Sequence, residues 1–335
     1  VDGTQIKKGG AGEQLQAAEG RKLLTSVSGN LTLLANIAPE DLGLTADLAN
    51  WIVGKDVLDE DNDDNVEENR WSFGDPLHSK PLPFTYVAGT GDQSDVTKVF
   101  VGTNDGLLRS IDANTGAEDW AFLPEELLGI QLTLMDNVRL ESSSDRAYGI
   151  DGSPQLWINN LGDDNIEAGD KVRLYVGMRR GGRNIYALDV SSTSSPDLMW
   201  TVKGGESGFE KLGQTWSSPK VVKVDSSYCG NQSLSCIVTM FGGGYHTSHD
   251  SADGGATPFT STDGEDGAGN AIYMVNARTG ELLLEISAND SGFGDMVYPI
   301  PSDLTLLDAN GDNVTDRVYV GDIGGQVWRV NLSGA

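Results

Sequence analysis

The residues best suited to chemistry in this sequence lie in one short run near its end. Oxygen-bearing side chains fall at the first, third, fifth and ninth places of this run, which hold Asp308, Asn310, Asp312 and Asp316. Calcium is a hard cation that takes about six to eight oxygen ligands, and an EF-hand loop supplies them at this spacing. The carbonyl of Val314 falls at the seventh place, where an EF-hand also uses backbone. The run therefore predicts a calcium site held by these five residues.

The surroundings of this run favour a calcium loop set between strands over an EF-hand. Gly311 and Asn313 tolerate the left-handed backbone that such a curl demands. The run leads into Arg317–Gly321, which alternates like a β-strand, and the glutamate of an EF-hand's twelfth place is missing. A solvated acidic turn is the alternative.

A second acidic run also has oxygen-bearing side chains at alternate places, at Asp59, Asp61, Asp63, Asn65 and Glu67. It is the weaker calcium candidate because it lacks an internal glycine. An acidic, solvated linker explains the same residues.

Two further residue pairs could carry chemistry. Cys229 and Cys236 are seven residues apart, which suits a small loop closed by a disulfide in an oxidising compartment. Two free cytosolic thiols are the alternative. His246 and His249 have a spacing that could bind zinc, but no glutamate base stands beside them.

Composition narrows the range of partners. The chain of 335 residues has 50 acidic and 23 basic residues, a net charge of −27. This imbalance argues against nucleic acid and against simple adsorption to anionic lipid, whereas bound divalent ions would relieve the self-repulsion. No apolar run approaches the ~18 residues that span a bilayer. The chain begins at Val1 without a signal-peptide pattern, so we expect a processed or excised portion of something longer.

The elements that position these residues are strands. The chain repeats one pattern of strands and turns four times. Each repeat has a strand, a Gly-rich turn and a second strand, within residues 99–112, 174–189, 237–276 and 318–331. The first three continue into a further short β run, at 119–122, 198–202 and 281–286. Another strand precedes each repeat, introduced by related phrases at 74–81, 148–154, 213–219 and 297–301. Four short strands recurring about every 60 to 80 residues predict an all-β fold, a β-propeller of four-stranded blades with loop insertions. A β-sandwich would not repeat the order of the motifs.

The repeats also set the expected domains. At least four blades are visible, at about 71–124, 148–203, 213–287 and 297–335, and together they form a propeller domain over 71–335. The last blade is incomplete, so we expect further blades or a partner strand to complete it. Residues 1–70 form a connecting segment that contains the acidic run at 59–67. This segment also carries a short helix over 45–53, with Thr45 as N-cap and Gly54 as stop.

Several segments together carry a family resemblance, and they occur in the right order. They are Asn50–Asp56 with Gly74–Pro81, Gly102–Leu107, Arg179–Asn184 with Tyr186–Asp189, and the 308–316 run before Asp316–Asp322. In these segments the chain resembles the PilY1/PilC family of type IV pilus tip proteins. The resemblance implies a C-terminal propeller, a calcium site that modulates pilus extension and retraction, and a role in adhesion and twitching motility. It also implies a location at the pilus tip or outer membrane, with pilins or minor pilins and a host or abiotic surface as partners.

An enzyme is the principal alternative. Ile111–Trp120 resembles the tryptophan-docking motif of quinoprotein alcohol dehydrogenases, which are also propellers. That motif is structural, and those enzymes hold their quinone with adjacent cysteines, which Cys229 and Cys236 are not. No Ser-His-Asp set or Walker loop is present in readable context. We therefore expect a protein that is not an enzyme, with a structural assembly scaffold as a further alternative.

Overall fold

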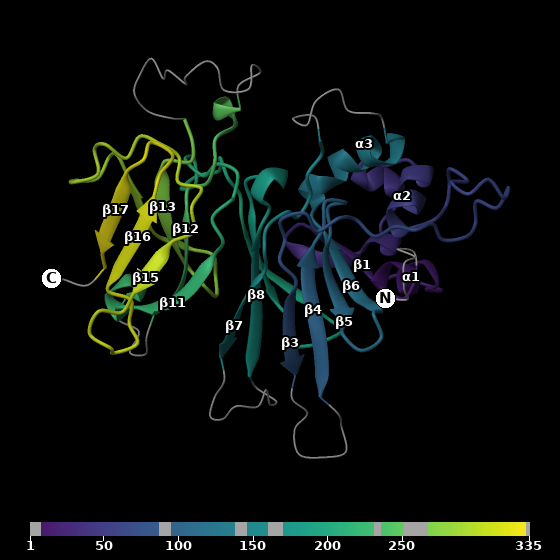
Figure 1. The fold of residues 1–335 in the computed structure, drawn as a ribbon, viewed down its shortest axis with the longest axis horizontal. Helices are drawn as coiled ribbons and strands as arrows, with labels where there is room; N and C mark the ends of the chain where they lie inside the picture. Colours follow the sequence, from purple (N-terminus) through teal and green to yellow (C-terminus); the bar gives the residue numbers. More distant parts are fainter. Residues whose placement is uncertain are drawn as a thin grey trace. The chain divides into compact units, whose positions relative to one another are not determined.

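Four sheets follow one another along the chain and carry most of its regular structure (Figure 1). The computed structural model describes residues 8–86, 95–137, 146–159, 170–230, 236–250 and 267–332. None of the helices among these residues combines the length and apolar character needed to cross a membrane.

Each predicted repeat forms one sheet, whose strands pair in chain order. The first repeat contributes β3 (Leu82–Tyr86), β4 (Val96–Gly102), β5 (Leu108–Asp112) and β6 (Glu118–Leu123). The second contributes β7 (Gln155–Asn159), β8 (Lys171–Gly177), β9 (Ile185–Asp189) and β10 (Asp197–Val202). The third contributes β11 (Lys220–Val224), β12 (Cys236–Gly242), β13 (Ala271–Asn276) and β14 (Leu282–Ser287). The fourth contributes β15 (Thr305–Leu307), β16 (Arg317–Gly321) and β17 (Val327–Asn331). The strands expected from the repeat are confirmed, and so is a fourth unit of three described strands.

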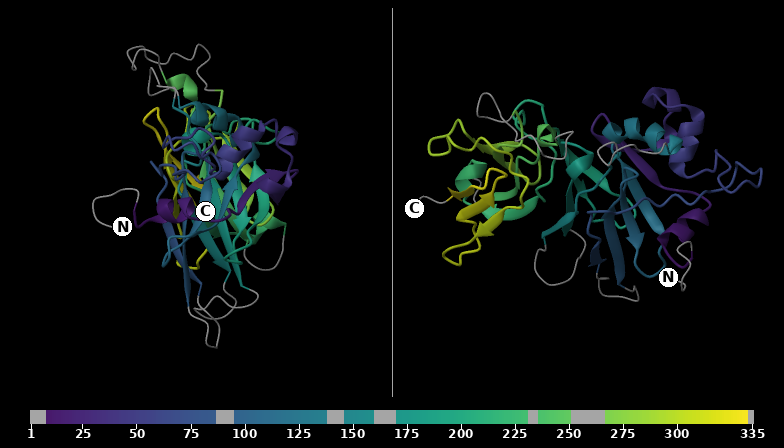
Figure 2. Two further views of the ribbon diagram at one scale, coloured as in Figure 1. Left: turned by 90° about the vertical axis from the view of Figure 1, so that its right-hand side faces the viewer. Right: turned by 45° about the horizontal axis from the view of Figure 1, so that its top comes forward.

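A hairpin near the N-terminus adds two strands that the repeat did not predict. Strands β1 (Leu23–Val27) and β2 (Asn30–Leu33) are joined by Ser28 and Gly29, which both have positive φ, as a tight two-residue hairpin turn requires. Strand β1 runs parallel to β6 and pairs with it, which makes the first sheet six-stranded (Figures 1 and 2). The domain boundary expected near residue 70 stays a prediction, and this pairing crosses it.

The helices are short. They are α1 (Ala11–Gln16), α2 (Ala46–Val53) and α3 (Gln131–Asp136), with 3-10 turns at Leu34–Asn36, Pro39–Leu42, Glu125–Ile130, Arg179–Gly181, Ser226–Cys229 and Thr247–His249. The predicted helix over 45–53 is confirmed in α2. The Thr45 hydroxyl accepts a hydrogen bond from the Leu48 amide at 3.1 Å, and Gly54 ends the helix with φ of 105°. Leu48, Trp51 and Ile52 are its buried residues.

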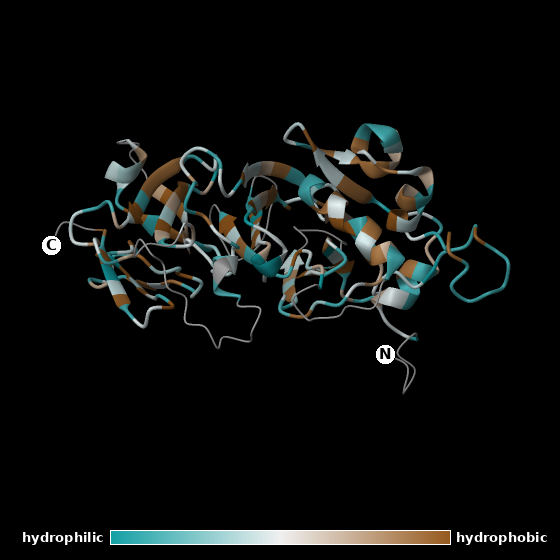
Figure 3. Cartoon of the chain, turned by 90° about the horizontal axis from the view of Figure 1, so that it is seen from above, coloured by the Kyte–Doolittle hydropathy of each residue, from teal (hydrophilic) through white to brown (hydrophobic). Residues whose placement is uncertain are grey.

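Contacts divide the chain into two units. The first comprises residues 1–154, 158–173 and 189–198, and the second comprises 155–157, 174–188 and 199–335. In the second unit, β12 buries both of its faces, as its alternating side chains show. Val238 and Met240 belong to one apolar cluster, whereas Phe241 belongs to another and Ile237 packs against it. Hydrophobic and hydrophilic residues are correspondingly interspersed along the strands (Figure 3). A sheet covered on both faces is the arrangement expected of a propeller blade between its neighbours.

The recurring phrases before the strands have a physical role. Ser79 Oγ accepts a hydrogen bond from the amide of Gly102 at 2.9 Å, and Ser217 Oγ accepts one from Gly242 at 3.0 Å. Each glycine ends the second strand of its blade, where a Cβ would lie 2.2 Å from one backbone oxygen at Gly102 and 2.5 Å from another at Gly242. Serine and glycine therefore recur together because they form the same contact in the first and third sheets.

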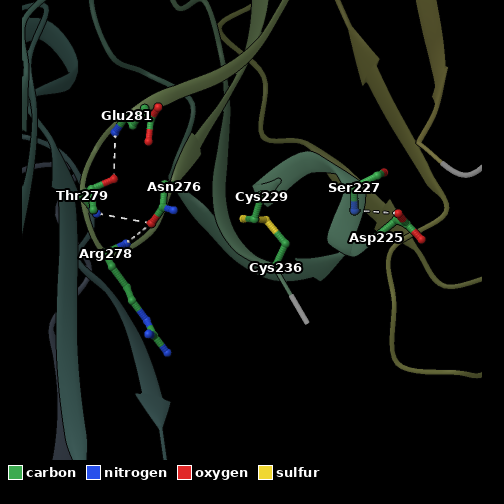
Figure 4. Close-up of a disulfide and its surroundings, with 8 residues drawn as sticks. All are labelled: Asp225, Ser227, Cys229, Cys236, Asn276, Arg278, Thr279 and Glu281. Carbon is green, nitrogen blue, oxygen red and sulfur yellow. Dashed lines mark hydrogen bonds between the residues drawn. A yellow bond between two sulfur atoms is a disulfide. The ribbon is translucent and has the colours of Figure 1, made fainter. Parts of the chain in front are cut away.

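A tryptophan and a turn lock the second unit together. The indole of Trp200 in β10 packs on the turn of residues 276–280, and its Nε1 donates to the Ala277 carbonyl at 3.1 Å. A Cβ at Gly280 would lie 2.9 Å from that ring, so the contact needs glycine there. The Asn276 side chain accepts hydrogen bonds from the amides of Arg278 and Thr279, which shapes the turn (Figure 4). The docking motif is assigned to Ile111–Trp120, whereas this contact is made by Trp200. Trp120 is fully buried, and its Nε1 has no hydrogen-bond partner among the described residues.

Cys229 and Cys236 are joined by a disulfide in this structure (Figure 4). The bond connects the 3-10 turn Ser226–Cys229 to the first residue of β12. It therefore closes the connection between β11 and β12 in the third sheet. Because the two cysteines are not adjacent, this bond gives no support to the quinoprotein alternative.

Candidate calcium-binding loops

The loop 308–316 joins β15 to β16 and curls around its own first carboxylate. Asp308 accepts hydrogen bonds from the amides of Gly311 at 2.7 Å and Asn313 at 2.8 Å. Both residues have the positive φ that the sequence predicts, 83° at Gly311 and 65° at Asn313. Further along, Asn310 Oδ1 accepts from the Asp312 amide at 2.9 Å, and Asp312 Oδ1 accepts from the Val314 amide at 2.8 Å. The alternate spacing thus turns each oxygen-bearing side chain back toward the loop.

These hydrogen bonds favour the ionised carboxylate at the start of the loop. Desolvation alone would raise the pKa of Asp308, but the amides of Gly311 and Asn313 outweigh it, so the pKa lies below its ordinary value. A carboxylate has about four lone-pair sites, so an oxygen that accepts an amide proton can still accept a cation.

Asp316 lies at the other end of this loop and is only 7% exposed. Its Oδ2 accepts a hydrogen bond from the Ala309 amide at 2.8 Å, which joins the two ends of the loop. Asn310 Nδ2 donates to Asp312 Oδ2 at 3.1 Å. Asp308, Asp312 and Asp316 do not belong to any group of three acidic side chains whose oxygens lie within 4.8 Å, among the described residues. The carboxylates of the stronger candidate therefore face backbone amides in this structure.

The second acidic run brings its carboxylates closer together. Oxygens of Asp59, Asp61 and Asp63 lie within 4.8 Å of one another. The amide of Asp63 donates to Asp59 Oδ1 at 2.9 Å, and the amide of Asn65 donates to Asp63 Oδ1 at 2.8 Å. Glu67 donates its amide to Asn65 Oδ1 at 3.2 Å and has no place in the cluster. Three of the five predicted residues therefore converge.

A second cluster contains two residues, Asp56 and Glu68, that the sequence did not predict as ligands. Oxygens of Asp56, Asp61 and Glu68 also lie within 4.8 Å of one another. The loop is closed by a bridge between Lys55 and Asn69, beside which the Asp56 amide donates to the Glu68 carbonyl at 3.0 Å. The alternate-place rule counts along the chain, whereas this closure joins the ends of the loop. No local spacing signal marks Asp56 and Glu68.

The carboxylates of this loop repel one another. Asp63 contributes most to raising the pKa of Glu68, followed by desolvation and by the charges of Asp61, Asp56 and Asp59. Asp56 is only 2% exposed, and both of its carboxylate oxygens accept from the Glu60 amide. A divalent cation would neutralise the carboxylates that repel one another here.

The histidine pair gives zinc no comparable cluster. His246 and His249 belong to no group of three potential ligands in the described part of the chain. The nearby Arg180 instead pairs with Asp250 at 3.4 Å.

Comparison with known proteins places this arrangement in context. The profile of the PilY1 beta-propeller domain matches residues 81–335. A type IV pilus biogenesis factor PilY1 homolog of Xylella fastidiosa is 29% identical over 245 residues, which cover 70% of this chain and 14% of that protein. The type IV pilus biogenesis factor PilY1 of Pseudomonas aeruginosa is 25% identical over 299 residues, covering 83% of this chain and 22% of the relative.

A solved structure is also similar. The C-terminal domain of Pseudomonas aeruginosa PilY1 aligns at 23% identity with a TM-score of 0.47, covering 71% of this chain and 38% of that one. The chain thus spans less than a quarter of the two curated relatives described above.

Proposed function

Because this chain belongs to the PilY1 β-propeller family, we propose that it serves in type IV pilus biogenesis as a calcium-binding surface protein. Its place is the pilus tip or the outer surface of a bacterium, and its partners are pilins or minor pilins and the surface to which the pilus attaches. Its role is binding and conformational control, with no turnover of a substrate. The names of the curated relatives support the pilus assignment.

The preformed curl of residues 308–316 carries the calcium part of this proposal. Asp308, Asn310, Asp312 and Asp316 would supply side-chain oxygens, and Val314 a carbonyl. Two left-handed residues already hold the curl, and its first carboxylate is kept ionised by backbone amides. The loop of residues 59–68 is the second candidate, supported by its clustered carboxylates.

Calcium would act on the pilus by selecting one arrangement of a loop and the strands beside it. Asp316 makes this coupling possible, because its carbonyl accepts from the Leu332 amide at 2.7 Å while its carboxylate accepts from Ala309. A change in loop 308–316 is thereby connected to the residue that follows β17. A ligand shifts such an equilibrium only by its differential affinity for the two states.

Calorimetric titration tests whether these loops bind calcium. Wild type should take up calcium, Asp308→Ala with Asp316→Ala should lose one site, and Asp59→Ala with Asp61→Ala should lose another. Asp197→Ala with Glu206→Ala removes the same charge from exposed positions and should bind as wild type does. Unchanged stoichiometry and affinity in the 308/316 variant would contradict the main assignment.

A second experiment tests what the site does. Lysine at position 312 places a positive charge where the cation would sit. Alanine at this position gives the loop neither that positive charge nor the carboxylate of Asp312. Asp312→Lys and Asp312→Ala should therefore differ in surface piliation, twitching and attachment when introduced into the full-length protein. If both strains behave as wild type although calcium binding is lost, the site only stabilises the fold and does not control the pilus.

A further inference from the structure

A cavity of about 600 Å³ lies within the first unit, lined by residues of α2, α3 and the segments 70–75 and 104–107. Pockets that hold small molecules have about this volume. Part of its wall is apolar, from residues such as Phe73, Leu107 and Leu134. None of the candidate calcium ligands lines it, so any function here is separate from the proposed function.

The polar part of the wall is rich in donors that have no acceptor. Trp51 Nε1, Arg70 Nε and Arg146 Nε are buried and find no hydrogen-bond partner within the described ranges. All three belong to residues that line the cavity, and Trp51 is only 7% exposed. Indole and guanidinium groups donate hydrogen bonds but cannot accept them. A ligand that satisfies this wall must therefore bring acceptors.

The charges of the lining favour an anion. Arg146 pairs with Asp75 at 2.6 Å, and Arg21 pairs with Glu118 at 2.6 Å. Arg70 has no ion pair among the residues that the structure describes. Its guanidinium donates to the carbonyls of Trp51 at 3.1 Å and Trp71 at 3.4 Å. Burial lowers the pKa of Arg70 although the charges of Glu60, Asp105 and Asp56 act against it, so a further negative charge beside this partly buried cation would be favourable.

Arg70 and Trp51 are close enough to serve one ligand group. The guanidinium carbon of Arg70 lies 3.9 Å from the centroid of the Trp51 ring. The unpartnered Nε of Arg70 and Nε1 of Trp51 therefore belong to stacked groups, and the two oxygens of a carboxylate could reach both.

The remaining lining excludes two other ligand classes. Asp75 and Asp105 also line the cavity and would repel a doubly charged phosphate more strongly than a singly charged carboxylate. A neutral sugar stacks best between open aromatic faces, and one face each of Trp51 and Phe73 is already occupied, by Arg70 at 3.9 Å and by Arg109 at 4.6 Å.

We propose that this cavity binds a small carboxylate ligand with an apolar body. The carboxylate pairs with Arg70 and accepts from Trp51, while the apolar body packs against Phe73 and Leu134. Such a ligand supplies a further negative charge beside Arg70 and acceptors for the unpartnered donors, and it leaves the apolar wall dry.

The experiment compares two probes that differ in charge alone. N-acetyl-L-phenylalanine has the carboxylate and the apolar body, and N-acetyl-L-phenylalaninamide replaces the carboxylate with a neutral amide. Calorimetry on the full chain at fixed calcium should show the acid binding at least about tenfold more tightly than the amide. Equal binding of the two probes, no binding of either, or tighter binding of inorganic phosphate would overturn the proposal.

Variants place the binding in this cavity. Arg70→Gln should weaken the acid at least about tenfold and leave the amide unchanged. Arg278→Gln, the same change at an exposed turn of the second unit, should have no effect. Ala147→Trp places a large side chain on another part of the cavity wall and should abolish binding, which keeps the test decisive if Arg70→Gln does not fold. Wild-type affinity in either folded cavity variant would refute the site.

Discussion

At the scale of single residues, Trp200 shows how one side chain couples two blades. Its ring packs on Gly280 and its Nε1 donates to the carbonyl of Ala277. That carbonyl also accepts from the Tyr175 hydroxyl at 2.9 Å, so it keeps a partner if the indole is lost. Packing and hydrogen bonding at this residue can therefore be separated by substitution.

Trp200→Ala should lower the free energy of unfolding by about 3–5 kcal/mol, because it leaves a large cavity beside the turn. Trp200→Phe should cost less, about 1 kcal/mol for the lost hydrogen bond beyond its smaller loss of packing, since Ala277 stays bonded to Tyr175. Urea unfolding followed by far-UV circular dichroism measures both. Equal losses in the two variants would show that the hydrogen bond, not the packing, holds the turn.

Asp112 gives the stability a dependence on acid pH. The hydrogen bond from Lys98 is the largest cause that lowers its pKa to about 2 from 3.8, and the amide and hydroxyl of Thr115 and the amide of Asn114 add to it. Because the pKa is lower in the folded state, its stabilisation is complete above about pH 4 and is lost as the pH falls toward 2.

Asp112→Asn should therefore be less stable than wild type at neutral pH and approach it near pH 2. Lys98 keeps Asp119 at 2.8 Å, so the variant should still fold. Urea unfolding of both proteins at several pH values tests this, with Asp197→Asn as an exposed control. A difference that stays constant from pH 7 to 2 would exclude Asp112 as the titrating group.

At the scale of elements, the N-terminal segment is held to the first sheet by strand pairing and by a buried charge cluster. Glu118 in β6 accepts from Arg21 Nε at 2.6 Å and from Arg109. Burial alone would raise the pKa of Glu118, but the charges of Arg109 and Arg21 outweigh it, so the pKa lies below its ordinary value. The carboxylate is thus ionised between two guanidinium groups from different segments.

Glu118→Gln should destabilise the protein by about 3–5 kcal/mol, because it removes the buried carboxylate that pairs with Arg21 and leaves Arg109 with Asp105 alone. Limited proteolysis should then cut within residues 8–22 before the rest of the chain unfolds. Glu281→Gln, a change on the exposed turn before β14, is the matched control for denaturant unfolding. Equal stability of the two variants would mean that strand pairing alone holds the segment.

Most strands could be predicted from the sequence, but not all of the pairings between them. The strands of the repeats were predictable because alternation and glycine turns are local signals. The turn of Ser28 and Gly29 was also a local hairpin signal, yet the pairing of β1 with β6 joins residues about a hundred positions apart and has no local signature. The same difference between local and distant contacts applies to the acidic loop of residues 56–68. The spacing of Asp59, Asp61 and Asp63 was readable, whereas the closure that brings in Asp56 and Glu68 was not.

At the scale of the whole molecule, the net charge of −27 opposes the folded state. Screening by simple salt should relieve part of this repulsion. Raising sodium chloride from about 10 mM to about 150 mM shortens the Debye length from about 30 Å to about 8 Å. Specific binding of calcium should stabilise further, by mass action on the folded state.

Calcium chloride should therefore raise the Tm more than magnesium or sodium chloride does at equal ionic strength, and a chelator should reverse the difference. Differential scanning calorimetry measures this. The control is a variant that combines the 308/316 and 59/61 alanine substitutions, because it lacks both proposed sites and keeps only the screening effect. Identical shifts with calcium and magnesium in wild type would show that screening, without a selective site, accounts for the stabilisation.

The pairing of β1 with β6 also prevents self-association through the edge of the first sheet. Leu23, Leu24 and Thr25 lie opposite Ala121, Phe122 and Leu123, and the Ala121 amide donates to the Lys22 carbonyl at 2.9 Å. Without the hairpin, these backbone groups would form an open, apolar edge able to recruit a strand from another molecule. A protein shortened to begin at residue 71 would thus be prone to self-association even if every blade still folded.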